Sequence, residues 1–407
     1  MQTIIKLKDI ATHMDLEPAE EVAPNPVLET QPTQIAPCGQ VVPKAPKKRV
    51  DSQKGLGVHQ AIVSGGKTIP LLKTMLTTAC ERDCYYCPFR AGRRYRRTTF
   101  KPEEMAQTVS DLYRAGLVKG LFLSSGIIGG GVKTQDKLLK TADLLRNKHQ
   151  YRGFLHLKLM PGVEKAQVAR AMELADRLST NLEAPNDKRL EALAPKKEFV
   201  EELLRPLEWV EEIRREKRPL NSWNGRWPSS VTQFVVGGTE ESDVEILTAS
   251  HHLYKHLKLG RTYFSAFRPI LDTPLENRTA ENPIRQNRLY QASFLFRDYG
   301  FDLEEMPFGQ NGRLPRDEDP KIAWAKANLS HSPIELNKAT QRELLRVPGI
   351  GPQSAKAILA ARRRGKLREL TDLQAIGARN VRRLMPFVLM AGKRPLPTTS
   401  PNQMRLF

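Results

Sequence analysis

The chain has 407 residues, of which 40% are hydrophobic and 27% charged, a balance typical of globular proteins. Lys and Arg outnumber Asp and Glu by 65 to 45, and the formal charge of +20 favours a polyanionic partner. The sequence has only four cysteines, no signal peptide at its start and no apolar run long enough to span a membrane, so we expect a cytoplasmic protein without membrane contacts or a disulfide framework.

Residues 1–55 are expected to form a mostly disordered arm. They are rich in Pro, Glu, Gln and Thr up to Pro43, become basic over 44–49, and show no hydrophobic period typical of a helix or a strand. The basic run has two interpretations, a solvated linker or a contact to nucleic acid. One of the cysteines, Cys38, lies in this arm.

Residues 56–305 alternate short β-like runs with amphipathic helical stretches. This alternation predicts an α/β fold with a parallel sheet, partly closed as a (β/α)6 barrel, whose working residues lie at the C-terminal strand ends. The predicted strands cover residues 71–77, 120–125, 154–160, 177–183, 231–237 and 261–267. The predicted helices cover residues 102–116, 134–147, 164–176, 187–217, 240–258 and 281–299.

The strongest motif is a cysteine loop at residues 80–87, directly after the first predicted strand. Cys80, Cys84 and Cys87 form a C-x3-C-x2-C run. Thiolates are soft donors suited to iron–sulfur clusters or zinc, and three of them leave one iron of a 4Fe-4S cluster without a protein ligand. A structural zinc site would need a fourth Cys or His at regular spacing, and only Cys38 or an isolated histidine could supply it.

Because Tyr86 places an aromatic residue just before the third cysteine, the motif resembles that of the radical S-adenosylmethionine superfamily. The resemblance implies a partial barrel of the radical S-adenosylmethionine type and a 4Fe-4S cluster held by Cys80, Cys84 and Cys87, with S-adenosylmethionine on the open iron. It also implies reductive cleavage of S-adenosylmethionine to a 5′-deoxyadenosyl radical, with a reductase such as flavodoxin or ferredoxin as electron donor. The residues that it implies around S-adenosylmethionine are Tyr86, Ser125, Gly126, Ser179, Asn181, Glu183 and Gly237.

An arginine-rich stretch that includes Arg93 and Arg94 follows the cysteine loop and is interleaved with Phe89, Tyr95 and Phe100. Such a stretch can hold phosphates while its aromatic rings stack on bases. The alternative is a solvated loop with salt bridges to the acidic helical stretch near residues 198–212. The sequence alone leaves both interpretations open.

The C-terminal part is expected to be a small all-α domain over residues 331–394, preceded by a linker or hinge at 306–330 and followed by a tail at 395–407. The segment LNKAT and the later VPGIG, within residues 336–351, resemble a helix-hairpin-helix motif, and a degenerate second hairpin follows at 370–380.

The predicted partner of this domain is the DNA backbone. From Lys321 to the end, the sequence has 17 basic and 4 acidic residues, so much of the excess positive charge of the chain lies there. Glycines at the start of a helix bring bare amides to a phosphate, whose charge the helix dipole favours. The residues expected to contact phosphates are Gly349, Gly351, Lys356 and Gly377. The alternative is a helical bundle that binds another protein.

Radical chemistry combined with a DNA-binding module predicts an enzyme that repairs DNA or modifies a base or sugar, with backbone contacts and no sequence specificity. The chain is similar to DNA modification or repair proteins of the radical S-adenosylmethionine type, and spore photoproduct lyases are functional analogues. Those lyases use a cysteine near the active site as hydrogen donor, and the only spare one here is Cys38. Two alternatives are a radical enzyme that modifies RNA and a non-enzymatic DNA-binding protein whose iron–sulfur cluster is structural or redox-sensing.

Overall fold

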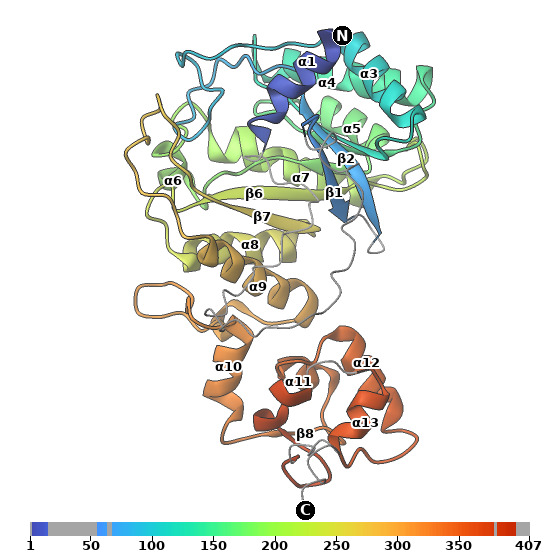
Figure 1. The fold of residues 1–407 in the computed structure, drawn as a ribbon, viewed down its shortest axis with the longest axis vertical. Helices are drawn as coiled ribbons and strands as arrows, with labels where there is room; N and C mark the ends of the chain where they lie inside the picture. The colour runs from blue at the N-terminus through green and yellow to red at the C-terminus, as the bar shows by residue number, and fades with distance from the viewer. Residues whose placement is uncertain (1, 15–54, 63–66, 378–380, 396–407) are drawn as a thin grey trace, which may run out of the picture. The chain divides into compact units, whose positions relative to one another are not determined.

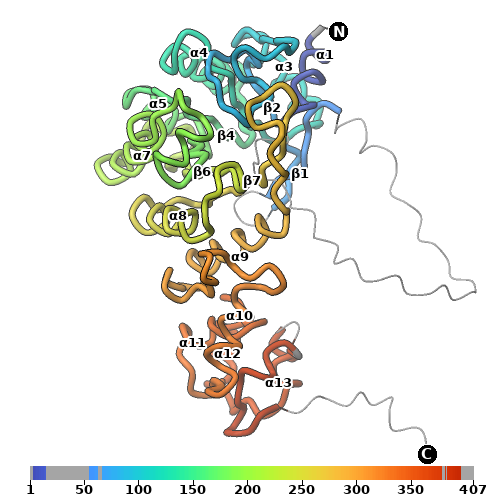
Figure 2. Tube along the Cα trace, turned by 90° about the vertical axis from the view of Figure 1, so that its left-hand side faces the viewer, coloured from blue at the N-terminus to red at the C-terminus, as the bar shows by residue number. Residues whose placement is uncertain are grey.

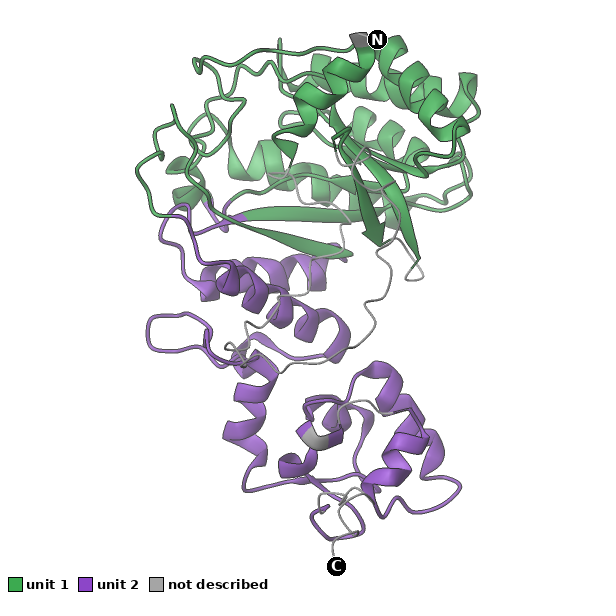
Figure 3. Cartoon of the chain, viewed as in Figure 1, with its two compact units in different colours: residues 1–183, 187–234, 259–279 green, residues 184–186, 235–258, 280–407 purple. Residues whose placement is uncertain are grey.

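The computed structural model describes residues 2–14, 55–62, 67–377 and 381–395. The chain forms two compact units (Figure 3). Unit 1 comprises residues 1–183, 187–234 and 259–279, and unit 2 comprises residues 184–186, 235–258 and 280–407. This division differs from the predicted boundary at residue 305, because the helices at Asp243–Leu257 and Pro283–Tyr299 pack against each other and belong to unit 2.

A seven-stranded sheet, curled into a half-barrel, organises the N-terminal two thirds of the chain (Figure 1). Its strands follow chain order: β1 Val58–Ile62, β2 Thr68–Met75, β3 Gly120–Ser124, β4 Phe154–Lys158, β5 Arg177–Ser179, β6 Ser229–Val236 and β7 Arg261–Ala266. The strands from β2 to β6 pair in parallel, whereas β1 pairs with β2 in antiparallel orientation. The predicted partial parallel barrel is therefore confirmed, with β1 as an additional edge strand that the sequence analysis missed.

Helices follow the strands of unit 1 and lie along one side of the sheet (Figure 2). They are α3 Pro102–Arg114, α4 Gly131–Asp143, α5 Lys165–Leu174, α6 Asp187–Glu191 and α7 Arg205–Glu216, with π-helical turns at Leu144–Lys148 and Phe199–Leu204. Pro102 occupies the first turn of α3, where its missing N–H costs no helical hydrogen bond. The long helical stretch predicted at 187–217 is divided into α6, a π-helical turn and α7.

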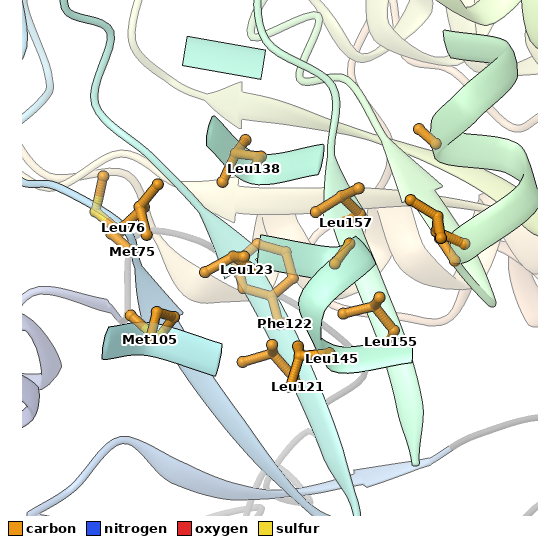
Figure 4. Packing of buried hydrophobic residues seen from close by; sticks show 14 of the residues in the cluster. Met75, Leu76, Met105, Leu121, Phe122, Leu123, Leu138, Leu145, Leu155 and Leu157 are labelled. Carbon is orange, nitrogen blue, oxygen red and sulfur yellow. The ribbon is translucent and has the colours of Figure 1, made fainter. Parts of the chain in front are cut away.

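Alternation along the strands separates the hydrophobic core from a polar interior. The leucines of one face pack in the main core and include Leu121, Leu123, Leu155 and Leu157, which are drawn in Figure 4. The opposite face carries Phe122, with His156 edge-on to its ring at 4.7 Å, and then Lys158. Phe122 itself belongs to the core cluster, so the polar side chains on this face begin beside it with His156 and Lys158, and such buried polar groups need partners.

The prediction of a disordered arm is wrong for residues 2–14, because helix α1 spans Gln2–Ala11. Leu7 and Ile10 are three residues apart on one face of the helix and Met14 follows just after its end, and each is at most 2% exposed in the main core. Lys6 adds an ion pair to Glu104 with an Nζ–Oε1 distance of 2.7 Å. The helix is thus held by its buried apolar face. Residues 15–54, including Cys38, lie outside the described residues.

Unit 2 is helical. It contains α8 Asp243–Leu257, α9 Pro283–Tyr299, α10 Pro320–Leu329, α11 Gln341–Arg346, α12 Pro352–Ala361 and α13 Leu370–Ala375, with a two-stranded sheet of β8 Ile334–Glu335 and β9 Val388–Leu389. Short 3-10 turns lie at Leu303–Glu305, Val381–Arg383 and Met385–Phe387. The predicted linker at 306–330 contains α10, whose Ala325 and Leu329 join the core of the C-terminal helices. None of the described helices is long and apolar enough to cross a membrane.

Candidate active site

A single pocket in unit 1 gathers most of the residues that the sequence analysis singled out in the barrel. It opens where β2 to β6 end, so strand-end residues and the loop after β2 form its wall. Eight of the ten predicted cluster and cofactor residues line it: Cys80, Cys84, Tyr86, Cys87, Ser125, Gly126, Asn181 and Glu183. Ser179 and Gly237 are not among its lining residues.

The three cysteines are free thiols on the loop after β2. The Sγ atom of Cys80 accepts a hydrogen bond from the backbone N–H of Ile127 at 3.4 Å, and Cys84 is 7% exposed. Burial raises the pKa of both Cys84 and Cys87, and the negative charge of each neighbouring thiolate adds to the effect. Buried thiolates at this site therefore need positive charge beside them, from a metal centre or a side chain.

One such positive charge comes from Lys197, which forms a buried ion pair with Glu183. The Nζ–Oε1 distance is 3.0 Å, and the two side chains are 9% and 4% exposed. Burial alone lowers the pKa of Lys197, but the negative charges of the Cys84 thiolate and the Glu183 carboxylate raise it above its ordinary value. Burial alone raises the pKa of Glu183, yet Lys197 and Lys158 outweigh burial and lower it. Both groups are therefore charged at neutral pH.

Lys197 reaches the pocket because its segment is fastened to the cysteine loop. The Tyr85 N–H donates to the Leu193 carbonyl at 2.8 Å. Arg82 donates to the carbonyl of Lys196 and forms an ion pair with Glu202. These contacts hold residues 193–202 against the cysteine loop, so the position of Lys197 is set by several independent bonds.

Gly126, after β3, is needed because the cysteine loop approaches its backbone closely. A Cβ atom at this position would lie 2.2 Å from the Ala79 carbonyl oxygen and 3.2 Å from Cys80 Cβ. The Gly126 N–H donates to the Thr77 carbonyl at 2.7 Å. Only glycine allows this approach, so the Gly126 backbone forms the wall directly beside Cys80.

The polar residues after β5 have separate roles. Asn181 accepts a hydrogen bond from Lys158 Nζ at 2.6 Å inside the pocket. Ser179 instead hydrogen-bonds His156 at 2.8 Å within the sheet, which explains why it does not line the pocket. Glu183 adopts a left-handed backbone with φ of 64°, a conformation that disfavours a non-glycine residue. Strand alternation alone would not have distinguished these three positions.

Gly237 belongs to unit 2, at the end of β6. It has a φ of 86°, and its N–H donates to the carboxylate of Glu241. In the same unit, Arg285 forms ion pairs with Glu241 and Asp243 and is 1% exposed. The structure therefore gives Gly237 a role in the turn into α8.

The arginines of the arginine-rich stretch make different contacts. Arg97 donates four hydrogen bonds to backbone carbonyls around the cysteine loop, and Arg93 donates to the carbonyls of Pro88 and Leu271. The side chain of Arg94 is exposed. Arg93 and Arg97 thus brace the loop, and neither makes the predicted salt bridge to the acidic segment near 198–212.

The four predicted phosphate contacts lie in the C-terminal helices of unit 2. Gly349 is exposed with a φ of 86°, Gly351 is the N-cap of α12, and Lys356 is exposed on that helix. Gly377 is exposed with a φ of 83° after α13. Its hairpin runs into residues 378–380, which lie outside the described residues, so the predicted second hairpin is described only in part.

Several pocket residues were not predicted. Lys158 ends β4 facing the interior, and alternation along the predicted strand could have revealed it. Gln233 on β6 offers the same signal. Lys197 lies in a highly charged stretch that is typical of a solvated helix, and His13 lies in the predicted arm, so no local pattern points to either residue.

No set of three or more His, Cys, Asp or Glu side chains in the described part of the chain is grouped to hold a single metal ion. The three cysteines instead line a common pocket.

Comparisons with known proteins bear on both units. Residues 74–251 match the family model of the Radical SAM superfamily, and residues 330–388 match that of the helix-hairpin-helix motif. A search of curated proteins found no match to the sequence.

Three solved structures show weak similarity. Methylornithine synthase (PylB) matches with 12% identity and a TM-score of 0.44, over 56% of this chain and 61% of that one. The FeFe-hydrogenase maturase HydG from Carboxydothermus hydrogenoformans matches with 14% identity and a TM-score of 0.44, over 56% and 51%. The methyltransferase TsrM from Kitasatospora setae matches with 11% identity and a TM-score of 0.38, over 54% and 39%. The chain thus spans less than two thirds of the length of each.

Proposed function

We propose that this chain, a radical S-adenosylmethionine superfamily enzyme with a C-terminal helix-hairpin-helix motif, begins a repair or modification reaction on DNA by hydrogen abstraction. The observation that carries the proposal is the single pocket in which three cysteines lie with a buried, charged set of polar side chains. Superfamily members use a 4Fe-4S cluster and S-adenosylmethionine, which together supply an electron and a 5′-deoxyadenosyl radical when bound.

The residues of the pocket suit both cofactors. Cys80, Cys84 and Cys87 would hold the cluster, whose irons would supply positive charge to the thiolates in addition to that of Lys197. The Oε2 atom of Glu183 is buried and accepts no hydrogen bond from the described residues, although Oε1 accepts one from Lys197. A buried acceptor without a donor costs free energy, so it fits a ligand hydroxyl or ammonium group.

The pocket would also protect the reaction from water. Tyr86 is half-buried at the pocket, and burial together with the Glu183 carboxylate raises its pKa well above the ordinary value, so its hydroxyl keeps its proton. Ser125 and Gly126 would present backbone and hydroxyl groups beside Cys80. The expected contribution of the protein is orientation of the cofactor and exclusion of competing hydrogen donors. A flavodoxin or ferredoxin would deliver the electron.

Binding to DNA is inferred from unit 2. Gly349 and Gly351 flank the turn into α12, where exposed amides can meet a phosphate, and Lys356 is exposed one turn further along. The excess of 17 basic over 4 acidic residues after residue 320 supports an anionic partner. Contacts of this kind are made to the backbone, so we expect no sequence preference.

The test is a binding titration of the full chain with duplex DNA and with tRNA, by fluorescence anisotropy at several salt concentrations. Lys356→Ala should weaken DNA binding and reduce the slope of log K against log salt by about one. Lys326→Ala is the matched control, since Lys326 is 60% exposed in the same unit but pairs with Glu318. Tighter binding to tRNA would favour the RNA alternative, and binding to neither would refute a nucleic acid substrate.

A further inference from the structure

The loop after β7 presents a large apolar side chain to solvent. Leu271 is 80% exposed, one of the two most exposed large hydrophobic residues among those described. Its loop is ordered by its own hydrogen bonds, because Thr273 Oγ1 donates to the Ile270 carbonyl at 2.7 Å and the Asp272 N–H donates to Glu276 at 2.7 Å. Exposed leucines scattered singly are normal on protein surfaces, so any function of Leu271 depends on what surrounds it.

The same loop is attached to the cysteine loop through one arginine. Arg93 Nε donates to the Leu271 carbonyl at 2.9 Å, and its Nη1 donates to the Pro88 carbonyl at 2.8 Å. Pro88 directly follows Cys87, which lines the pocket. Leu271 is therefore one arginine side chain away from the wall of the candidate active site, and both lie in unit 1.

The surroundings of Leu271 favour an anionic partner. Arg94 and Arg268 are exposed, on the arginine-rich stretch and just after β7. Exposed Asp272 and Glu276 offset part of this charge, and Asp272, with a left-handed φ of 61°, accepts the Arg94 backbone N–H at 3.3 Å. An exposed leucine on a loop with exposed arginines near it suits a partner that is anionic outside and aromatic within, such as stacked nucleic acid.

A reaction inside an enclosed pocket requires the target base to leave the duplex. Enzymes that act on bases extrude the nucleotide, and apolar side chains such as leucine can insert between base steps and hold them apart. We propose that Leu271 inserts into the DNA base stack and keeps the target nucleotide flipped toward the pocket, with Arg94 on the adjacent phosphate. This inference rests on the proposed action on DNA, and it assigns the loop at residues 268–278 to substrate opening.

The experiment uses the full chain and a short duplex with 2-aminopurine placed in a mismatch, where extrusion costs least. Unstacking brightens 2-aminopurine, so wild-type protein at saturation should raise its fluorescence severalfold. Leu271→Ala should lose most of this rise while anisotropy still reports a complex. Leu271→Met, which keeps an apolar tip, should retain it. Leu220→Ala is the control, because Leu220 is 84% exposed in the same unit and lies away from the arginine-rich stretch in sequence.

The outcomes separate the two proposals. A wild-type complex without a fluorescence rise, or a Leu271→Ala complex as bright as wild type, would overturn the assignment of Leu271 while leaving DNA binding intact. Absence of any complex by anisotropy would overturn the proposed action on DNA, and with it the role of the loop. An equal loss in Leu220→Ala would show that the effect is not specific to Leu271.

Discussion

Replacing Lys197 by Met tests whether the buried pair with Glu183 sets the charge of the pocket. Removing one partner of a buried ion pair leaves an uncompensated charge, which typically costs about 3–5 kcal/mol. Here the ammonium and carboxylate lie 3.0 Å apart, with side chains 9% and 4% exposed, so solvent can compensate little. We therefore expect Lys197→Met to lower the free energy of unfolding of unit 1 by about this amount.

The assay is urea unfolding of the cluster-free protein followed by tryptophan fluorescence, since three of the four tryptophans lie in unit 1. Lys165→Met is the matched control, because the Lys165–Glu212 pair has the same chemistry but side chains 44% and 42% exposed. The control should unfold like wild type. The double variant Lys197→Met with Glu183→Gln should recover part of the loss, since no charge is then left unpaired.

The pH dependence should follow from the lowered pKa of Glu183. A carboxyl group with a lowered pKa stabilises the folded state above its unfolded pKa, and this contribution disappears as the pH falls through the folded value. Wild-type stability should therefore decline on acidification below about pH 4.5, the ordinary value for Glu, and Lys197→Met should lose this part of the decline. Equal stability of Lys197→Met and wild type at neutral pH would refute the reasoning.

Three further variants probe other parts of the account. Gly126→Ala should prevent iron–sulfur reconstitution, measured by absorbance, because its Cβ would lie 2.2 Å from the Ala79 carbonyl oxygen; normal cluster content would contradict the close approach. Arg97→Lys should speed proteolysis of the cysteine loop severalfold, because lysine cannot replace four hydrogen bonds to carbonyls, and an unchanged cleavage rate would argue against bracing. Burial lowers the pKa of Lys321 to about 7, so the stability of unit 2 should rise with pH between about 7 and the ordinary lysine value of 10.5. Urea unfolding of Lys321→Met should show no such rise, and a rise that persists in this variant would refute the assignment to Lys321.

Much of the barrel was predictable because buried parallel strands appear in the sequence as short runs of apolar residues. The strands at 120–124, 154–158 and 261–266 match their predicted runs within two residues. Two N-terminal elements were missed for different reasons. Helix α1 is brief and lies next to a long polar stretch, so its single apolar face was not recognised. Strand β1 has only five residues, and the spacing of Val58, Ala61 and Ile62 in it does not follow the two-residue period of a strand.

The site was predictable where a local motif defines it and not where the tertiary fold brings residues together. The C-x3-C-x2-C spacing identified the cysteines, and alternation brought Asn181 to the pocket. Ser179 obeys the same alternation, yet a neighbouring strand supplies His156 as its partner, which no single strand reveals. Lys197 enters the pocket only because a distant segment packs on the cysteine loop.

We propose that the cysteine pocket generates a radical from S-adenosylmethionine. Its most direct test is anaerobic reconstitution with iron and sulfide, reduction by dithionite in the presence of S-adenosylmethionine, and chromatography for 5′-deoxyadenosine, with Cys84→Ala as the control. We expect 5′-deoxyadenosine from the wild-type protein and none from Cys84→Ala. An intact, reduced cluster that yields no 5′-deoxyadenosine would contradict it and favour a structural or redox-sensing cluster.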